Sequence, residues 1–306
     1  MSLRTLIVGS RGSQLALRQT EIALAALSST NPDATFEVRT IRTSGDRTKA
    51  SLSEIGGRGV FVIEIEGSLL SGEIDIAVHS LKDLPAEETP GLAIAAVLPR
   101  ENPRDVLVSR SEAKLADLPS GATVGTGSPR RAAQLIAMRS DLRIADIRGN
   151  VDTRIRKVDA GEYDAVVLAA AGLARLGCLD RASQIFEPDE MLPAAGQGAL
   201  ALQVRADDAE TFALALSVDH AETRAAVEAE RSFERRLGGG CRAAIAALAE
   251  VGGERLRLRG LVADPRGGEL IRGEQEGSAA DPESVGRVLA ERLMEEGAAA
   301  LLEATA

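Results

Sequence analysis

The most constraining feature of this chain is the alternation of short apolar strands with helices over its first two thirds. A strand over Thr5–Val8 precedes a helix that begins at Ser13, and a strand over Thr123–Gly125 precedes a helix near Ser128-Pro129. Further strands are predicted over Thr35–Arg42, Ile74–Val78, Leu92–Leu98, Leu142–Ile147, Asp164–Ala169 and Leu200–Val204. Strands that alternate with helices form mostly parallel sheets covered by helices. The sequence therefore predicts an α/β fold.

Two turn-rich segments divide this alternating region. Pro99–Arg104 contains two prolines and several charges, which is typical of a crossover between domains, and residues 193–198 form a second candidate hinge. The last third has a different pattern, with a long helix over Ala221–Leu237 followed by strands, which indicates a small α+β unit. We therefore predict a first domain of residues 1–98 with 198–217, a second of residues 99–197 and a third of residues 218–306.

Two helices carry specific predictions about their ends and buried faces. Asp281 is expected to cap the last helix, because proline at the next position favours the first helical turn. The predicted apolar face of that helix consists of Val285, Val288, Leu289 and Leu293. The predicted apolar face of the first helix consists of Leu15, Ile22 and Ala26.

Arginines gather at three predicted helix starts. Arg11 precedes the Ser13 cap, Arg130 and Arg131 follow Ser128-Pro129, and Arg148 and Arg154 flank the start at Asn150. A helix N-terminus already carries partial positive charge, so arginine there is unfavourable unless an anion is bound. Bidentate guanidinium–carboxylate pairing would add geometric selectivity. The alternative is that these arginines pair with acidic residues such as Asp146 or Asp152.

Composition narrows the choice of partner. The formal net charge of −10 disfavours nucleic acid, and aromatic residues, which would stack on bases, make up only 2% of the chain. No stretch approaches the roughly 20 apolar residues of a membrane span, and no signal peptide is recognisable, so the cytosol is the expected location. The two cysteines and two histidines lack the spacing of a zinc site, so no metal is expected.

A few polar residues stand out individually. Lys82-Asp83 follows an apolar strand, either as a solvated turn or as a carboxylate facing a cleft. Cys241 follows three glycines, which leave room beside its sulfur for a bulky group, whereas Cys178 has the surroundings of a buried residue. His79 is interpreted as a strand-end residue with a structural role. The polar, glycine-containing segment Thr43–Gly59 is predicted to be a mobile loop over the cleft.

Taken in order, six segments of the chain resemble the hydroxymethylbilane synthase (porphobilinogen deaminase) family. They are Ser10–Leu17, His79–Pro85, Gly125–Arg131, Ile147–Arg154, Ala195–Gly198 and Gly239–Cys241. The resemblance runs nearly end to end. It implies two doubly wound domains like those of type II periplasmic binding proteins, followed by a small α+β domain. It also implies a monomer that joins four porphobilinogens head to tail, with loss of ammonia, onto a covalent dipyrromethane.

The same resemblance implies roles for individual residues. Asp83 matches the catalytic carboxylate, and Cys241 matches the cysteine that carries dipyrromethane through a thioether. The other cofactor-binding matches are Lys82, Thr126, Ser128, Arg130 and Arg131. The substrate-binding matches are Arg11, Ser13, Arg148, Arg154, Arg175 and Gln197.

Some positions depart from the family pattern, and a different class of protein is the alternative. Arg58 stands where relatives often have lysine, basic residues are more usual at Glu54 and Ile63, and the segment beginning at Arg242 is also unusual. The alternative is an intracellular, non-catalytic, two-lobed anion-binding protein. Such a protein would need neither Asp83 nor a modified cysteine, so the mass of the purified protein separates the two hypotheses.

Overall fold

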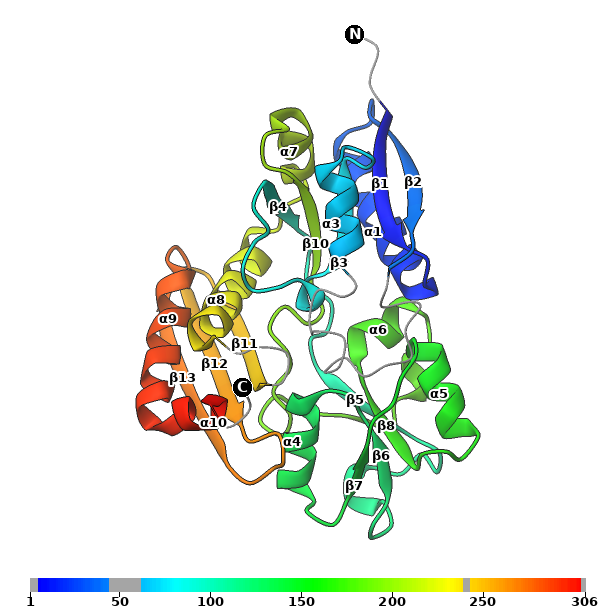
Figure 1. Cartoon of the computed structure of the whole chain (residues 1–306), viewed down its shortest axis with the longest axis vertical. Helices are drawn as coiled ribbons and strands as arrows, with labels where there is room; N and C mark the ends of the chain where they lie inside the picture. Colours follow the sequence, from blue (N-terminus) through cyan, green and yellow to red (C-terminus); the bar gives the residue numbers. More distant parts are fainter. Residues whose placement is uncertain (1–4, 44–61, 239–242, 304–306) are drawn as a thin grey trace. The chain divides into compact units, whose positions relative to one another are not determined.

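A computed structural model describes residues 5–43, 62–238 and 243–303 of the chain (Figure 1). Its internal contacts divide the chain into two compact units. The first comprises Met1–Glu101 and Ala199–Arg224, and the second comprises Asn102–Gly198 and Ala225–Ala306. The chain therefore leaves the first unit within the predicted crossover and returns directly after the predicted hinge.

The first unit is built on a five-stranded sheet in the order β2-β1-β3-β10-β4. Strand β1 pairs in parallel with β2 and β3, whereas β10 runs antiparallel between β3 and β4. The strands are β1 (Thr5–Arg11), β2 (Thr35–Ile41), β3 (Ile76–Ser80), β4 (Leu92–Val97) and β10 (Leu200–Arg205). The helices are α1 (Gln14–Thr30), α3 (Ile63–Leu70), the 3-10 turn η1 (Leu81–Asp83) and α7 (Ala209–Leu216).

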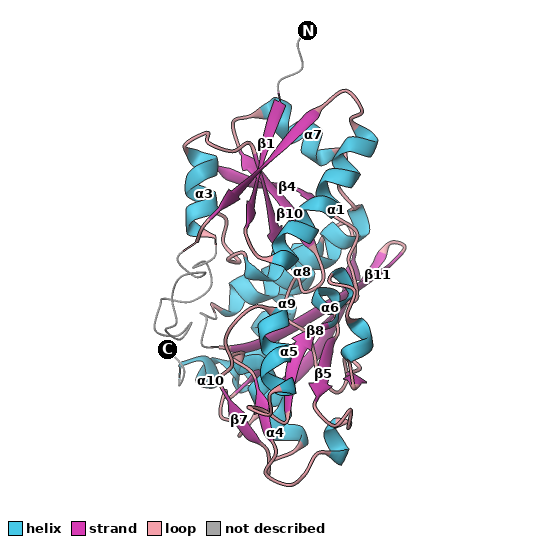
Figure 2. Ribbon diagram, turned by 90° about the vertical axis from the view of Figure 1, so that its right-hand side faces the viewer, coloured by secondary structure: helices cyan, strands magenta, loops and turns pink. Residues whose placement is uncertain are grey.

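Alternation along β3 explains why both faces of this sheet are covered. Ile76 and Val78 pack in the cluster that contains Leu27 of α1, whereas Ala77 between them packs in the cluster that contains Leu69 of α3. Successive strand residues point to opposite faces, so the two helices lie on opposite sides, as Figure 2 shows.

The second unit contains a sheet with an equivalent topology, in the order β7-β6-β8-β5-β9. Strand β6 is parallel to β7 and β8, and β5 is antiparallel to β8. The strands are β5 (Asp105–Ser109), β6 (Thr123–Gly125), β7 (Arg143–Ala145), β8 (Ala165–Ala169) and β9 (Gln184–Ile185). The helices are η2 (Leu115–Asp117), α4 (Pro129–Met138), α5 (Val151–Asp159), α6 (Ala170–Arg175) and η3 (Leu179–Arg181). The predicted pair of doubly wound sheets is thus confirmed.

A third, antiparallel sheet completes the second unit. Its strands are β11 (Ala244–Gly252), β12 (Arg255–Ala263) and β13 (Leu270–Ser278), and its helices are α8 (Ala221–Leu237), α9 (Pro282–Leu293), the π turn η4 (Met294–Ala298) and α10 (Ala299–Glu303). One face packs against Phe233 of α8 and Leu289 of α9. The other face packs against Ala133 of α4 and Leu192. Helix α4 therefore contacts both the second and the third sheet.

Several details correct the sequence-based expectations. Val288 is 42% exposed, and Gly286 takes its place in the packed face, because a Cβ at Gly286 would lie 2.3 Å from the carbonyl oxygen of Ala229 in α8. The buried face of α1 is Gln19, Thr20, Ala23 and Leu27, offset from the predicted face. Strand β5 was not predicted.

Other expectations remain open. The separation of the third sheet as a domain of its own stays a prediction. The loop predicted over residues 43–59 lies, apart from Thr43, outside the described residues, as do Glu54 and Arg58. Among the helices that the structure describes, none combines the length and apolar character needed to cross a bilayer.

Candidate functional site

The candidate residues of the first unit lie at the carboxyl ends of β1 and β3. Arg11 ends β1, and Ser13 caps α1, accepting a hydrogen bond from the Ala16 backbone N–H at 3.2 Å, as predicted. Lys82 and Asp83 lie in η1, directly after β3. Because β1 and β3 are adjacent and parallel, these four residues share one edge of the sheet, where α/β folds bind ligands.

Asp83 is held in place by its neighbours in the turn. Leu81 and Leu84 on either side are 1% and 3% exposed, so both side chains anchor η1 in the core. The backbone N–H of Leu81 also donates to the carbonyl of Ala199 at 3.0 Å. Asp83 itself is half-buried, and within the described ranges its carboxylate has no hydrogen-bond or ion-pair partner. The turn therefore presents a fixed carboxylate that other groups in the first unit do not engage.

In the second unit, helix α4 begins directly beyond the carboxyl end of β6. Ser128 caps it by accepting from the backbone N–H of Arg131 at 3.5 Å, and Pro129 occupies the first turn, as predicted. The Thr126 hydroxyl accepts from the Ser128 N–H at 3.1 Å. Two hydroxyl side chains thus accept hydrogen bonds from backbone N–H groups at the start of α4, and both residues are candidate cofactor contacts.

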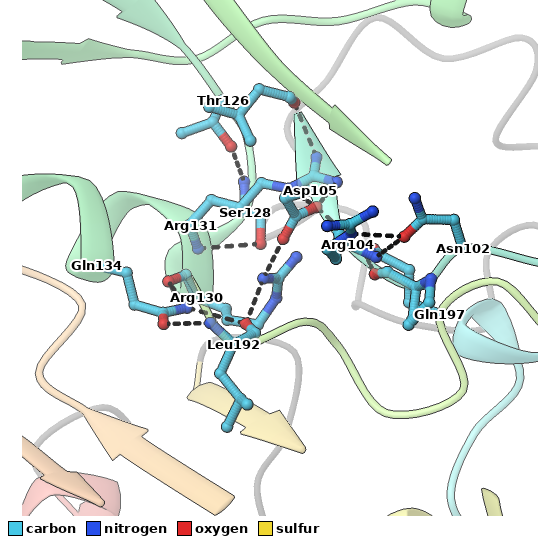
Figure 3. A network of polar contacts seen from close by, with 12 residues as sticks. Asn102, Arg104, Asp105, Thr126, Ser128, Arg130, Arg131, Gln134, Leu192 and Gln197 are labelled. Carbon is cyan, nitrogen blue, oxygen red and sulfur yellow. Dashed lines mark hydrogen bonds and ion pairs between the residues drawn. The ribbon is translucent and has the colours of Figure 1, made fainter. Parts of the chain in front are cut away.

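The guanidinium groups of Arg130 and Arg131 converge on Asp105, the first residue of β5 (Figure 3). Arg130 Nη1 lies 2.6 Å from Asp105 Oδ2, and Arg131 donates from Nε and Nη2 to Oδ1 at 3.0 and 2.7 Å. The two arginines are only 5% and 7% exposed, and Asp105 is fully buried. Burial alone would raise the pKa of Asp105, but the two arginine charges hold that pKa well below its usual range.

Arg148 and Arg154 flank the start of α5 after β7. Arg148 Nε donates to Asp146 Oδ2 at 3.1 Å, and Arg154 Nε donates to the carbonyl oxygen of Gly149 at 2.7 Å. Gly149 has φ of +109°, and a Cβ there would lie 2.7 Å from the Thr153 side chain, so this turn requires glycine. The helix begins as predicted, but the side chain of the capping residue Asn150 makes no capping hydrogen bond.

Arg175 contacts the segment by which the chain leaves the second unit, and Gln197 lies in that segment. Arg175, at the end of α6, donates from Nη2 to the carbonyl of Gly198 at 2.6 Å. Gln197 is fully buried, and its amide donates to the carbonyl of Pro103 at 2.6 Å and to Asp105 Oδ1 at 3.0 Å. The structure thus brings Gln197 together with Arg130 and Arg131, around Asp105.

The remaining candidates have different outcomes. Cys241 lies outside the described residues, and Arg242 with it. Cys178 is half-buried, and burial, with a smaller effect of the Asp180 charge, raises the pKa of its thiol. His79 is 5% exposed, and burial lowers the pKa of its imidazole to about 4, although the neighbouring Gln203 side chain offsets part of that effect.

The alternative in which helix-start arginines pair with acidic residues holds in part. Asp146 pairs with Arg148 as considered, but Asp152 pairs with Arg156, and the partner of Arg130 and Arg131 is Asp105. Sequence reasoning missed Asp105. The available signal was the apolar run Val106–Val108 directly after it, which marks a short buried strand.

Comparison with known proteins decides to which family this arrangement belongs. The family model "Porphobilinogen deaminase, dipyromethane cofactor binding domain" matches residues 6–213, and "Porphobilinogen deaminase, C-terminal domain" matches residues 224–295. The chain belongs to the porphobilinogen deaminase family. The porphobilinogen deaminase of Roseiflexus sp. (strain RS-1) is 49% identical over 98% of this chain and 99% of its own length. That of Geobacillus kaustophilus (strain HTA426) is 50% identical over 98% and 97%.

Solved structures also match, at lower similarity. The periplasmic VFT2 domain of BvgS from Bordetella pertussis has 17% sequence identity and a TM-score of 0.43, over 71% of this chain and 86% of that one. Membership of the porphobilinogen deaminase family rests on the sequence matches, and it confirms the family predicted from the six motifs.

Proposed function

We propose that the chain is a hydroxymethylbilane synthase. It condenses four porphobilinogen molecules head to tail, with loss of ammonia at each step, onto a covalently bound dipyrromethane, and then hydrolyses the linear tetrapyrrole from that primer. The observation that carries this proposal is the identity of about half of all residues with porphobilinogen deaminases, over nearly the full length of both chains.

The donor groups of the second unit fit a dipyrromethane, because its pyrrole rings bear carboxylate side chains. Arg131 uses three of its five N–H groups in hydrogen bonds to described residues, so donors remain for a further acceptor. The N–H groups of the α4 N-terminus lie beside it and also favour an anion. We assign the cofactor to Cys241, as a thioether, with Lys82, Thr126, Ser128, Arg130 and Arg131. Once bound, it supplies the pyrrole carbon to which the first substrate is joined.

The substrate contacts follow from the same chemistry. Every porphobilinogen adds an acetate and a propionate, so negative charge accumulates as the product grows. The Arg148 side chain is 31% exposed and has one carboxylate partner among the described residues, so its guanidinium can also bind an incoming anion. We assign substrate binding to Arg11, Ser13, Arg148, Arg154, Arg175 and Gln197.

Asp83 is assigned the catalytic role. As ammonia leaves porphobilinogen, positive charge develops on the reacting carbon and pyrrole nitrogen. Arginines that hold the substrate carboxylates would oppose this charge, so a fixed anion is needed near the reacting atoms. The Asp83 carboxylate is fixed by η1 and has no partner in the described ranges, which suits it to that task.

The proposal extends to the location and assembly of the enzyme. We place it in the cytoplasm as a monomer, acting on a small molecule without a nucleic-acid or membrane partner. The net charge of −10 supports this view against nucleic acid.

The mass of the intact protein tests the proposed function. The purified chain should exceed its sequence mass by one dipyrromethane, and Cys241→Ser should lose both the extra mass and the activity. Cys178→Ser is the matched control and should keep both. A modification on Cys178, or active protein without any modification, would overturn the assignment. Unmodified, inactive protein that still binds anions would favour the non-catalytic alternative.

A further inference from the structure

Antiparallel pairing explains how Asp105 reaches the anion-binding edge of the second sheet. Strands β6, β7 and β8 run in one direction, so their carboxyl ends share an edge. Strand β5 runs the opposite way, and its first residue Asp105 pairs with Ala169, the last residue of β8. A residue that begins a strand thereby lies at the edge where the parallel strands end, beside the start of α4.

The carboxylate divides its two oxygens between the two arginines. Oδ2 accepts from Arg130, and Oδ1 accepts twice from Arg131. Arg130 is held at a second point by the carbonyl of Leu192 at 2.8 Å, and Arg131 by the carbonyl of Val167 at 2.9 Å. Two long side chains that would otherwise sample many rotamers are thus fixed before any ligand arrives.

The same carboxylate makes the position of the arginines electrostatically tolerable. Adjacent positive charges in the first turn of a helix repel each other and are disfavoured by the helix dipole. A buried anion between them offsets both effects. The low pKa of Asp105 means that this anion persists at neutral pH.

We propose that Asp105 is a positioning residue that orients Arg130 and Arg131 toward the carboxylates of the dipyrromethane. This inference rests on the proposed function and adds to it a residue that the motifs do not contain. Gln197 belongs to the same hydrogen-bond network, because its amide donates both to Asp105 and to the carbonyl of Pro103. It thus holds the carboxylate against the segment by which the chain enters the second unit.

The test measures how much porphobilinogen is needed to load the apo-protein. Wild type, Asp105→Asn and Asp105→Glu are incubated with increasing porphobilinogen, and intact mass gives the fraction that carries dipyrromethane. Asp105→Asn should raise the concentration for half-loading at least tenfold. Asp105→Glu keeps the charge but displaces it by one methylene, so its half-loading concentration should lie between those of wild type and Asn.

Asp75→Asn in the first unit is the matched control. Asp75 is 2% exposed and pairs with Arg205 at 3.1 Å, so its loss disturbs a comparable buried ion pair away from α4. Its half-loading concentration should equal that of wild type. The proposal would be overturned if Asp105→Asn had the same half-loading concentration as wild type. Should the Asn variant not fold, the same half-loading concentration in Asp105→Glu and wild type would overturn it. So would an equal defect in Asp75→Asn. Wild type that never gains the mass would instead refute the proposed function.

Discussion

Replacing Asp83 with asparagine tests the proposed catalytic role most directly. The substitution keeps the shape of the side chain and removes its charge. Asp83 is half-buried and makes no hydrogen bond or ion pair within the described ranges, so the free energy of unfolding should change by no more than about 0.5 kcal/mol. Loss of a preorganised charge at a transition state typically costs about 3–4 kcal/mol, which corresponds to a rate lower by about 100- to 1,000-fold.

The assay is single-turnover elongation on protein already loaded with dipyrromethane, so that cofactor assembly does not enter the rate. The chain supplies a matched control, because Leu115-Ala116-Asp117-Leu118-Pro119 repeats the pattern of Leu81–Pro85, and Asp117 likewise ends a 3-10 turn between two buried leucines. Asp117→Asn should elongate at the wild-type rate. Asp83→Glu should retain more activity than Asp83→Asn. If the Asp83→Asn protein elongates at nearly the wild-type rate, Asp83 is a turn residue and the reasoning is wrong.

Three further predictions concern other parts of the chain. Arg148→Leu should leave the fold intact but weaken loading or elongation by about tenfold or more, as expected for a lost charged hydrogen bond. Arg156→Leu, which removes an exposed ion pair within helix α5, should leave loading and elongation unchanged, and equal kinetics in the two variants would contradict the assignment. His79 is buried with its pKa lowered from 6.5 to about 4, so the unfolded chain binds a proton that the folded protein does not. The contribution of neutral His79 to the free energy of unfolding should therefore be fully present above pH 6.5 and be lost, by up to about 3 kcal/mol, toward pH 4. Denaturant midpoints measured between pH 7 and 4.5 should fall more steeply in wild type than in His79→Gln. Gly286→Ala should destabilise the protein by about 3 kcal/mol, because the new Cβ would meet the α8 backbone, and an unchanged thermal midpoint would refute that packing.

Local signals predicted the N-terminal caps of several helices. Ser13, Ser128 and Asp281 each accept a hydrogen bond from a backbone N–H of the helix that they precede. This worked because capping depends on residues within one turn of each other. Two of the six motifs that carry the family resemblance, Ser10–Leu17 and Gly125–Arg131, lie at these helix starts, so part of the candidate site was predictable from local signals as well.

Long-range pairing set the limit of prediction. The interaction of Asp105 with Arg130 and Arg131 depends on an antiparallel strand joining a parallel sheet, which no local pattern encodes. The buried face of α9 depends on the close approach of α8 at Gly286, which exposes Val288 although its spacing fits an apolar stripe. In both cases the deciding partner lies more than 20 residues away in the sequence.

The place of β10 in the first sheet has a consequence for synthesis on the ribosome. This strand lies between β3 and β4, yet β4 ends at Val97 and β10 begins at Leu200. At about 5–20 residues per second, the nascent chain waits about 5–20 s for the strand that joins the two. During that interval β3 and β4 each present an unpaired edge, the kind of surface on which strands from other chains assemble. The order of translation thus leaves the N-terminal sheet incomplete until the whole of the second sheet has been made.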